Sequence, residues 1–360
     1  MQIRQRPIGG WTVLLLLVAL SGCAQSDEPG RAVEGFRFAE LPIGYSAVTH
    51  IANVLGLYEE EGVNYFEYPR PAGPDVVAAL RSAPQVGAHA GGIAVTPVVY
   101  MVGAGLSPVI LATTLQSNER VRLVTFTDNG ITEEPATLRG KRIGRVRGTV
   151  GEIYLSRLLA RGGMTESDID AIDGRPADLL GFLLRGDLDA AVLWDPFVTQ
   201  AGRLYENQMS LGEIPDRGEP HVLLDSSLYT LSFNIVTTYE KLRENRSQME
   251  KFIRAVVRAG DFIEANRPEA QVMLEEWLEL LPGDLDHLMA TTSFRVHLDV
   301  PEMERWLQEE LDWYRTTSAD GLVVAGDIGR FVDPSLLQEV ASTRVRLVDG
   351  AADSMGPQGD

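Results

Sequence analysis

The sequence predicts an α/β fold with two lobes and mainly parallel sheets. Short apolar segments alternate with amphipathic segments at helical spacing, which is typical of βα units. About 340 residues follow the N-terminal leader, which is more than a single hydrophobic core usually serves. The alternation begins again near Val121 and gives way to helices after residues 229–237. We therefore expect the chain to cross between the lobes twice, at 114–126 and at 229–237.

The N-terminus has the features of a secretory leader. Arg4 and Arg6 precede a nearly unbroken apolar run at residues 11–20. That run is too short to span a bilayer core of about 30 Å as a helix. It ends in the string LSGC at Cys23, which resembles the bacterial lipobox. We predict a lipoprotein signal peptide at 1–22 and a lipid on Cys23, which would hold the chain on a membrane outside the cytoplasm. The alternative is an ordinary signal peptide with a chance cysteine.

Composition excludes several classes of partner. Removal of residues 1–22 takes away two arginines, so the formal net charge falls from −19 to −21. A surface this acidic repels phosphate backbones, which argues against a nucleic-acid partner. Cys23 is the only cysteine, so no disulfide framework stabilises the mature chain. The five histidines are scattered without ligand spacing, and we expect neither a metal nor a cofactor.

We predict that the first βα series and the C-terminal helices form one lobe. The expected strands of the series lie at 36–41, 64–68, 86–90 and 109–114, and the expected helices around 51–58, 75–82 and 93–102. The C-terminal helices are expected at 249–265, 268–281 and 301–314. We assign residues 36–118 and 235–345 to lobe I.

The second βα series forms lobe II, residues 119–234. Its strands are expected at 121–126, 142–146 and 190–194, its helix at 151–161, and a helix start or turn at 166–169. Outside the two lobes, residues 23–35 are polar and aperiodic, and we expect a flexible tether there. Residues 346–360 are rich in Gly, Ala and Asp, and we expect a disordered tail.

Four segments follow expected strands and carry glycines, hydroxyls or an aromatic ring. In open α/β sheets ligands bind at the carboxyl ends of strands. The segments therefore predict a binding cleft between the lobes. Their candidate residues are Tyr45, Ser46 and Thr49; Gly91 and Gly92; Arg147, Gly148 and Thr149; and Trp194 and Asp195.

Each segment also has a purely structural interpretation. Ser46 or Thr49 could cap a helix, and Gly91-Gly92 could form a tight turn. Asp195 could cap the helix that Pro196 begins. The start of the helix at Gly148-Thr149 offers unpaired N–H groups and a dipole that attract anions, and Arg147 adds positive charge.

Catalytic motifs are not found in the sequence. It contains no GxSxG elbow, Walker loop, HExxH or GxGxxG. Gly44-Tyr45-Ser46 lacks the second glycine of a nucleophile elbow, so a binding loop is the better interpretation. We expect a protein that is not an enzyme.

Several segments resemble one family in order and spacing. They are GLYEEEGV at 56–63, DNGI at 128–131 with LRGKRIG at 138–144, Gly148-Thr149, GDLDAAVLWDP at 186–196, and the stretch at 321–332. The chain resembles the periplasmic solute-binding proteins of ABC importers in the nitrate/sulfonate/taurine group, which also includes binders of thiamine-pyrimidine precursors. Residues 80–88 depart from the family pattern, because the usual glycine and acidic residue are missing there. His89 and the Gly91-Gly92 pair also differ from the small polar residues that are common in the family at this point.

The resemblance implies a type II-like periplasmic-binding-protein fold that closes over a small ligand. It adds Thr113, Thr114 and Asn234 to the candidate cleft residues. The expected protein is a monomer in the periplasm or cell envelope that delivers an anionic or zwitterionic solute to a permease with its ATPase. The alternatives are a heteroaromatic ligand stacked on Tyr45 or Trp194, a ligand-sensing lipoprotein without transport, and an enzyme related to thiamine-pyrimidine or menaquinone synthesis.

Overall fold

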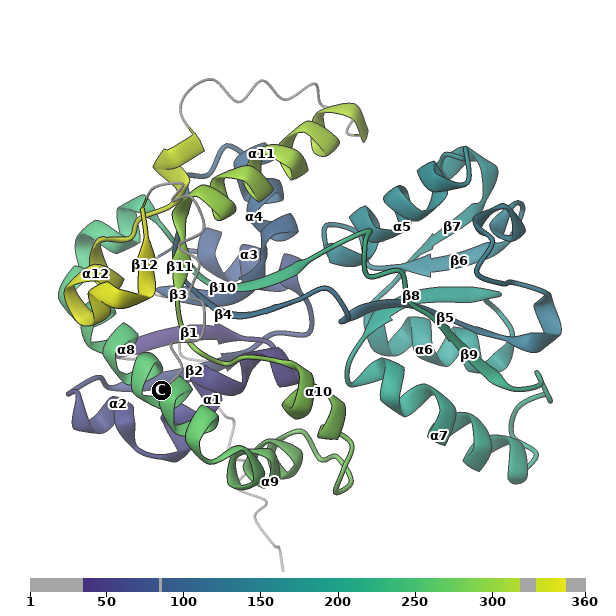
Figure 1. Cartoon of the computed structure of the whole chain (residues 1–360), viewed down its shortest axis with the longest axis horizontal. Helices are drawn as coiled ribbons and strands as arrows, with labels where there is room; N and C mark the ends of the chain where they lie inside the picture. The colour runs from purple at the N-terminus through teal and green to yellow at the C-terminus, as the bar shows by residue number, and fades with distance from the viewer. Residues whose placement is uncertain (1–34, 84–85, 318–327, 348–360) are drawn as a thin grey trace, which may run out of the picture.

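Two lobes lie side by side and are joined by two crossing segments (Figure 1). The computed structural model describes residues 35–83, 86–317 and 328–347. The expected signal peptide, Cys23 and all but the last residue of the tether lie outside the described residues, as does the tail from residue 348. Within the described ranges, no helix is long and apolar enough to cross a membrane.

Each lobe is built on a five-stranded sheet. The sheet of lobe I has the order β2-β1-β3-β10-β4, and that of lobe II has the order β7-β6-β8-β5-β9. The strands are β1 (Phe36–Glu40), β2 (Tyr65–Pro69), β3 (Ala90–Ala94), β4 (Pro108–Ser117), β5 (Val121–Phe126), β6 (Arg142–Arg145), β7 (Asp170–Asp173), β8 (Ala190–Trp194), β9 (Pro220–Leu223) and β10 (Leu231–Thr238). Strands β11 (Leu298–Asp299) and β12 (Val345–Arg346) form a separate parallel pair. Arg346, which the sequence prediction placed in the tail, lies in β12.

The two sheets share one topology. In each sheet four strands run in one direction and one strand runs against its neighbours, namely β10 in lobe I and β5 in lobe II. Each reversed strand is the first strand that follows a crossing from the other lobe. The predicted two-lobe fold, its mainly parallel sheets and both crossovers are therefore confirmed. The shared strand order is an internal repeat of structure that the sequence does not reveal.

Helices cover both sheets, and most of the C-terminal helices belong to lobe I (Figure 1). The helices are α1 (Ala47–Val54), α2 (Leu57–Glu60), α3 (Gly73–Arg81), α4 (Val95–Gly103), α5 (Val150–Arg161), α6 (Pro176–Arg185), α7 (Phe197–Ser210), α8 (Tyr239–Ala265), α9 (Arg267–Trp277), α10 (Asp286–Thr291), α11 (Val300–Thr317) and α12 (Ser335–Ala341). Short 3₁₀ helices lie at Gly44–Ser46, Thr127–Asn129, Pro135–Leu138, Glu166–Asp168, Ile328–Phe331 and Ser342–Arg344.

The strand expected at 86–90 is wrong. The backbone there turns back onto α3, because the Gly87 N–H donates to Ala83 O and the Ala88 N–H donates to Ala79 O. The strand begins only at Ala90 and runs to Ala94. The prediction also missed β7, whose residues Asp170–Asp173 form a half-exposed edge strand without an apolar run.

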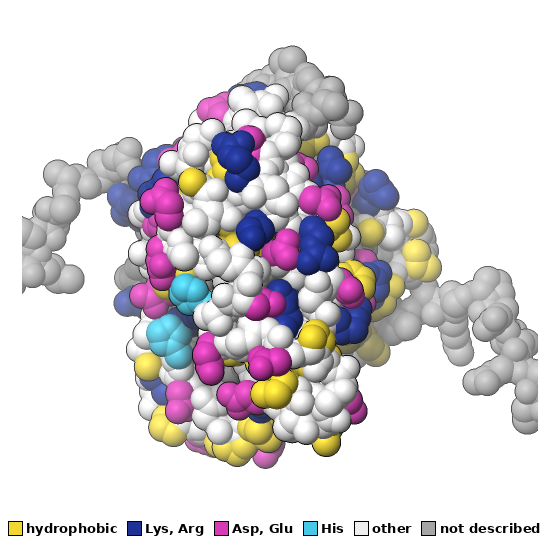
Figure 2. Space-filling model, turned by 90° about the vertical axis from the view of Figure 1, so that its right-hand side faces the viewer, with side chains coloured by type: hydrophobic (Ala, Val, Ile, Leu, Met, Phe, Trp, Pro, Cys, Tyr) yellow, Lys and Arg dark blue, Asp and Glu magenta, His cyan; other side chains and the backbone are white. Residues whose placement is uncertain are grey.

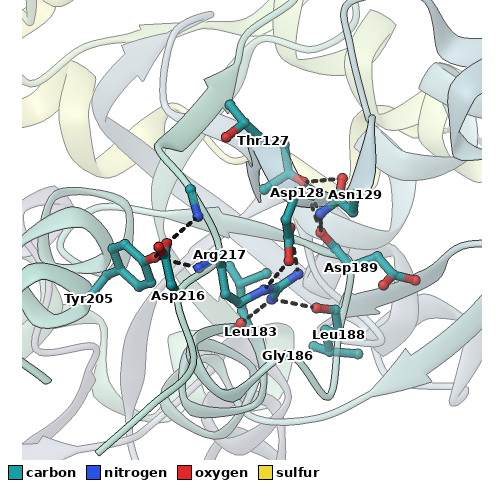
Figure 3. A network of polar contacts seen from close by, with 12 residues as sticks. Thr127, Asp128, Asn129, Leu183, Gly186, Leu188, Asp189, Tyr205, Asp216 and Arg217 are labelled. Atoms are coloured by element: carbon teal, nitrogen blue, oxygen red, sulfur yellow. Dashed lines mark hydrogen bonds and ion pairs between the residues drawn. The ribbon is translucent and has the colours of Figure 1, made fainter. Parts of the chain in front are cut away.

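The DNGI segment and the first residues of the GDLDAAVLWDP segment are bonded to each other inside lobe II (Figure 3). The buried Arg217 guanidinium donates from Nε to Asp128 Oδ2 at 3.0 Å and from Nη1 to Leu188 O at 3.0 Å. The Asn129 amide donates to Asp189 O at 2.7 Å. These bonds join the end of β5 to the turn before β8. The DNGI segment and residues 186–189 of the GDLDAAVLWDP segment therefore have a structural role in lobe II, whereas Trp194 and Asp195 lie at the junction of the lobes.

Candidate functional site

A small cavity lies where the two lobes meet. Its walls come from both lobes and from β10: Leu41, Ile43, Tyr45, Gly73, Ala94 and Pro97 from lobe I, Thr149, Val150 and Trp194 from lobe II, and Leu231 and Phe233 from β10. The cavity has a volume of about 30 Å³ and is lined mainly by apolar atoms. That space suits about one water molecule. The two lobes are in contact around this cavity and leave little free space in it.

Polar contacts hold the lobes together beside this cavity. The Tyr100 hydroxyl of α4 donates to Glu152 Oε2 of α5 at 2.6 Å. The Trp313 indole N–H of α11 donates to Ser156 Oγ of α5 at 3.0 Å. Glu152 and Ser156 are four residues apart, so they share the face of α5 that meets lobe I. A further ion pair joins Arg203 of α7 to Asp284 of lobe I at 2.7 Å.

The predicted anion site at the start of α5 is already filled by a side chain of the protein. Thr149 caps the helix, since its Oγ1 accepts from the Gly151 N–H at 3.2 Å. The Gly148 N–H donates to the buried carboxylate of Glu152 at 2.7 Å. The Arg147 side chain is 66 % exposed and lies 3.9 Å from Asp173. Thr149 lines the cavity, but the helix start has an internal anion in Glu152.

A second cationic group, absent from the sequence prediction, is buried between the lobes. Arg120 lies in the crossover between β4 and β5, and its side chain is 0 % exposed. Nη2 donates to Thr291 Oγ1 and to Thr292 Oγ1. Nε and Nη1 have no hydrogen-bond partner in the structure. Burial lowers the pKa of Arg120 below its usual value, because the guanidinium has been taken out of water.

Asp195 of lobe II faces this arginine. Its Oδ2 lies 3.8 Å from Arg120 Nη1 and 3.7 Å from Arg122 Nη2, both longer than a hydrogen bond. Oδ1 accepts from the Thr199 hydroxyl at 3.0 Å. Helix α7 begins at Phe197 with Pro196 at its N-cap, so the alternative in which Asp195 caps the helix is wrong. The two arginines and one aspartate leave a net positive charge at the junction of the lobes.

The first candidate loop reaches the cavity through Tyr45 alone. Its ring meets Phe233 edge to face, with centroids 6.1 Å apart, and its hydroxyl donates to Arg120 O at 3.1 Å. Ser46 is the N-cap residue of α1 but makes no side-chain cap hydrogen bond. The Thr49 hydroxyl donates to Ser46 O at 2.9 Å. Ser46 and Thr49 are buried in lobe I and are not among the residues lining the cavity.

Gly91 and Gly92 do not form a loop. They lie in the middle of β3, so both the loop after a strand and the tight turn are wrong. A Cβ on Gly91 would lie 2.5 Å from Val76 Cγ1, and one on Gly92 would lie 2.9 Å from Phe233 Cε1. No real side chain tolerates such distances. The two glycines therefore allow α3 and Phe233 to pack directly on the strand.

The remaining candidates join the two strands next to the hinge. Thr113 Oγ1 donates to Asn234 Oδ1 at 2.9 Å, and Thr114 Oγ1 donates to Phe233 O at 3.2 Å. Asn234 Nδ2 donates to Ser232 O at 3.0 Å. These polar groups are buried and bonded within lobe I. Trp194, by contrast, closes β8 and lines the cavity, which is where an apolar wall was expected.

Metal-ligand clusters are also missing from this region. Among the described residues, no group of three or more His, Cys, Asp or Glu side chains could hold a metal ion. The residues that the sequence reasoning missed are Arg120, Glu152, Tyr100 and Phe233. Arg120 has one visible signal, since it is a charged residue between two apolar strands at a predicted crossover.

Comparison with known proteins finds one family and one fold. The profile of the family described as NMT1/THI5 like matches residues 44–270. A putative binding protein of Brucella abortus (strain 2308) is 23 % identical over 245 residues, which cover 67 % of this chain and 70 % of the relative. A 4-amino-5-hydroxymethyl-2-methylpyrimidine phosphate synthase of Aspergillus parasiticus is 26 % identical over 246 residues, 66 % of this chain and 68 % of that one.

Solved structures support the same fold. The alkanesulfonate-binding protein SsuA from Xanthomonas axonopodis pv. citri, bound to MOPS, superposes with a TM-score of 0.68 at 17 % identity, covering 83 % of this chain and 98 % of that one. An identity this low supports a shared fold and does not assign a function. Because the family profile spans well over half of the sequence, the chain belongs to the NMT1/THI5-like family.

Proposed function

We propose that this protein is an extracytoplasmic solute-binding component of an ABC importer. The observation that carries the proposal is the cavity whose walls come from lobe I, lobe II and β10 together. A solute held there contacts all three only when the lobes are closed, so binding shifts the population toward the closed form. Closed and open forms present different surfaces to a permease, which is how such a shift is used in transport.

The solute would be small, with an anionic or zwitterionic head and an apolar body. Arg120 offers two buried nitrogen donors without partners, Nε and Nη1, and sulfonate or carboxylate oxygens would satisfy them. Asp195 stands opposite and suits an ammonium group, as in a taurine-like zwitterion. Tyr45, Trp194 and Phe233 supply apolar and aromatic walls. The present space holds about one water, so the solute must enter while the lobes are apart.

A heteroaromatic solute is the second candidate. The mainly apolar lining and the Tyr45 and Trp194 rings favour a flat ring that stacks. The synthase name of the Aspergillus relative, which mentions a pyrimidine, points in the same direction. A receptor that reports the solute to a signalling partner would use the same cleft.

Membrane attachment through Cys23 completes the proposal. Lipid on Cys23 would keep a monomeric receptor beside its permease and ATPase. Basic and acidic side chains are interspersed on the outer face of lobe II, so the face in view has no extended basic surface for nucleic acid (Figure 2). Labelling cells with a radioactive fatty acid should mark the wild-type chain and leave Cys23→Ala unlabelled.

A binding screen on residues 24–360 tests the proposal. Taurine, methanesulfonate, nitrate and 4-amino-2-methylpyrimidine would be compared by thermal unfolding and by calorimetry. A ligand at 100 times its Kd should stabilise the fold by about 2.7 kcal/mol. Stabilisation by the pyrimidine alone would replace the anionic assignment with the aromatic one. Chemical turnover of any ligand would contradict a binding-only function.

A further inference from the structure

A second pocket lies at the hinge, apart from the cleft. It is formed by Arg157 of α5, residues 227–230 between β9 and β10, and Arg305, Trp306, Glu309 and Glu310 of α11. Its volume is about 300 Å³, and its lining is mainly polar. Helices α5 and α11 belong to different lobes and lie on the same side of the crossing strands (Figure 1). The pocket therefore has walls from lobe I, lobe II and the hinge.

Glu310 is the least satisfied group of this pocket. The residue is 3 % exposed. Its Oε1 accepts from the Tyr229 hydroxyl at 3.0 Å, whereas its Oε2 has no hydrogen-bond partner. Burial raises the pKa of the Glu310 carboxyl to about 7. A buried acceptor without a donor is costly, so a bound donor at this position would stabilise the protein.

The two arginines of the pocket, Arg157 and Arg305, are bonded or paired to groups other than Glu310. Arg157 Nη1 donates to Leu228 O at 2.9 Å, and its Nη2 lies 3.9 Å from Glu309. Arg305 lies 3.3 Å from Glu302 and 3.8 Å from Glu309. A ligand that fits must therefore bring its own N–H donors. The two arginines repel multiply charged cations, so a single positive charge suits the pocket best.

We propose that the hinge pocket binds a small primary ammonium compound whose N–H groups donate to Glu310 Oε2. The pocket is separate from the solute cleft, so this site does not depend on the function proposed above. Because its walls come from both lobes, an occupant favours the arrangement in which helices α5 and α11 are close together, as they are here.

Calorimetry with ethylammonium chloride on residues 24–360, without any cleft solute, tests the site. We expect saturable binding that weakens at least tenfold in Glu310→Gln. Glu302→Gln removes the same charge from the same helix but does not line the pocket, so it should stay within threefold of wild type. Tetramethylammonium has the charge but no N–H donor and should bind at least tenfold more weakly. Equal binding of the two cations, or no change in Glu310→Gln, overturns the proposal.

Proton release gives a readout that needs no variant. The groups facing Glu310 are Tyr229 of the hinge segment, Thr96 of α4, Arg157 of α5 and Glu309 of α11. An ammonium ion favours the ionised carboxylate, so binding at pH 6 should release most of one proton and binding at pH 8 very little. Measurement in two buffers with different ionisation heats counts these protons. Absence of pH-dependent release in the wild-type protein would contradict the assignment even if Glu310→Gln fails to fold.

Discussion

Two groups of positively polarised N–H donors lie at the junction of the lobes, one at the start of α5 and one on Arg120. They differ in whether the protein itself already supplies an acceptor. At the start of α5, the Gly148 N–H is bonded to the Glu152 carboxylate, and Thr149 caps the helix. At the first crossover, Arg120 is fully buried with two nitrogen atoms unpartnered. The helix start has the expected glycine and hydroxyl but already holds a carboxylate, whereas Arg120 has side-chain donors without partners. An anion binds where hydrogen-bond donors have no partner in the protein. Sequence motifs do not show which donors already have one.

Replacing Arg120 should have the largest effect. Arg120→Gln removes a charged donor worth about 1.5–3 kcal/mol to an anionic solute, which is about a 10- to 150-fold loss of affinity. Thermal stability should stay the same or rise, because an underpaired buried charge is removed. Calorimetry and thermal unfolding on the same preparation measure both. Unchanged affinity would remove Arg120 from the binding site.

Replacing Glu152 should mainly affect stability. Glu152→Gln keeps the shape but removes the charge that serves Gly148 and Tyr100, at a cost of about 1–3 kcal/mol in the free energy of unfolding. Affinity for an anionic solute should change less than tenfold, since the variant frees the helix start for an anion while weakening closure. Urea denaturation measures the change in the free energy of unfolding. A larger loss of affinity in Glu152→Gln than in Arg120→Gln would mean that the start of α5 matters more for the solute than Arg120 does.

Removing the Tyr100 hydroxyl should have a smaller effect. Tyr100→Phe deletes one hydrogen bond between the lobes, worth about 1 kcal/mol. Closure becomes less favourable, so solute affinity should fall about fivefold. Calorimetry again gives the value, and Trp313→Phe, which deletes the bond to Ser156, provides a matched control on the same face of α5. A difference of more than tenfold between the two variants would mean that Tyr100 acts on the solute directly.

Arg147 should matter least. Its side chain is largely exposed, and its ion pair with Asp173 is long. Such pairs contribute about 0–1 kcal/mol. Arg147→Gln should change solute affinity by less than twofold at physiological salt. A tenfold loss in a titration would restore the start of α5 as the anion site.

Sequence reasoning succeeded where burial is continuous and failed where contacts come from distant residues. The strand at 190–194 is apolar throughout and is confirmed as β8, and both crossovers are confirmed. The glycines of β3 were misplaced because they serve the packing of Val76 and Phe233, neither of which is near them in sequence. Glu152 lies in a helix that was predicted, but its bond to Tyr100 spans 52 positions. Arg120 lies at a predicted crossover, but only the structure shows that its Nε and Nη1 atoms have no partners.

The position of β10 has a consequence for how the chain is made. Every strand of lobe II lies between residues 121 and 223, so its sheet is complete once that stretch has been synthesised. In the sheet of lobe I, β10 lies between β3 and β4, although it follows the whole of lobe II in the chain. Strand β4 has no partner in that sheet until residues 231–238 arrive. Lobe II can therefore fold before lobe I is complete, and β3 and β4 each have an exposed edge until β10 pairs with them.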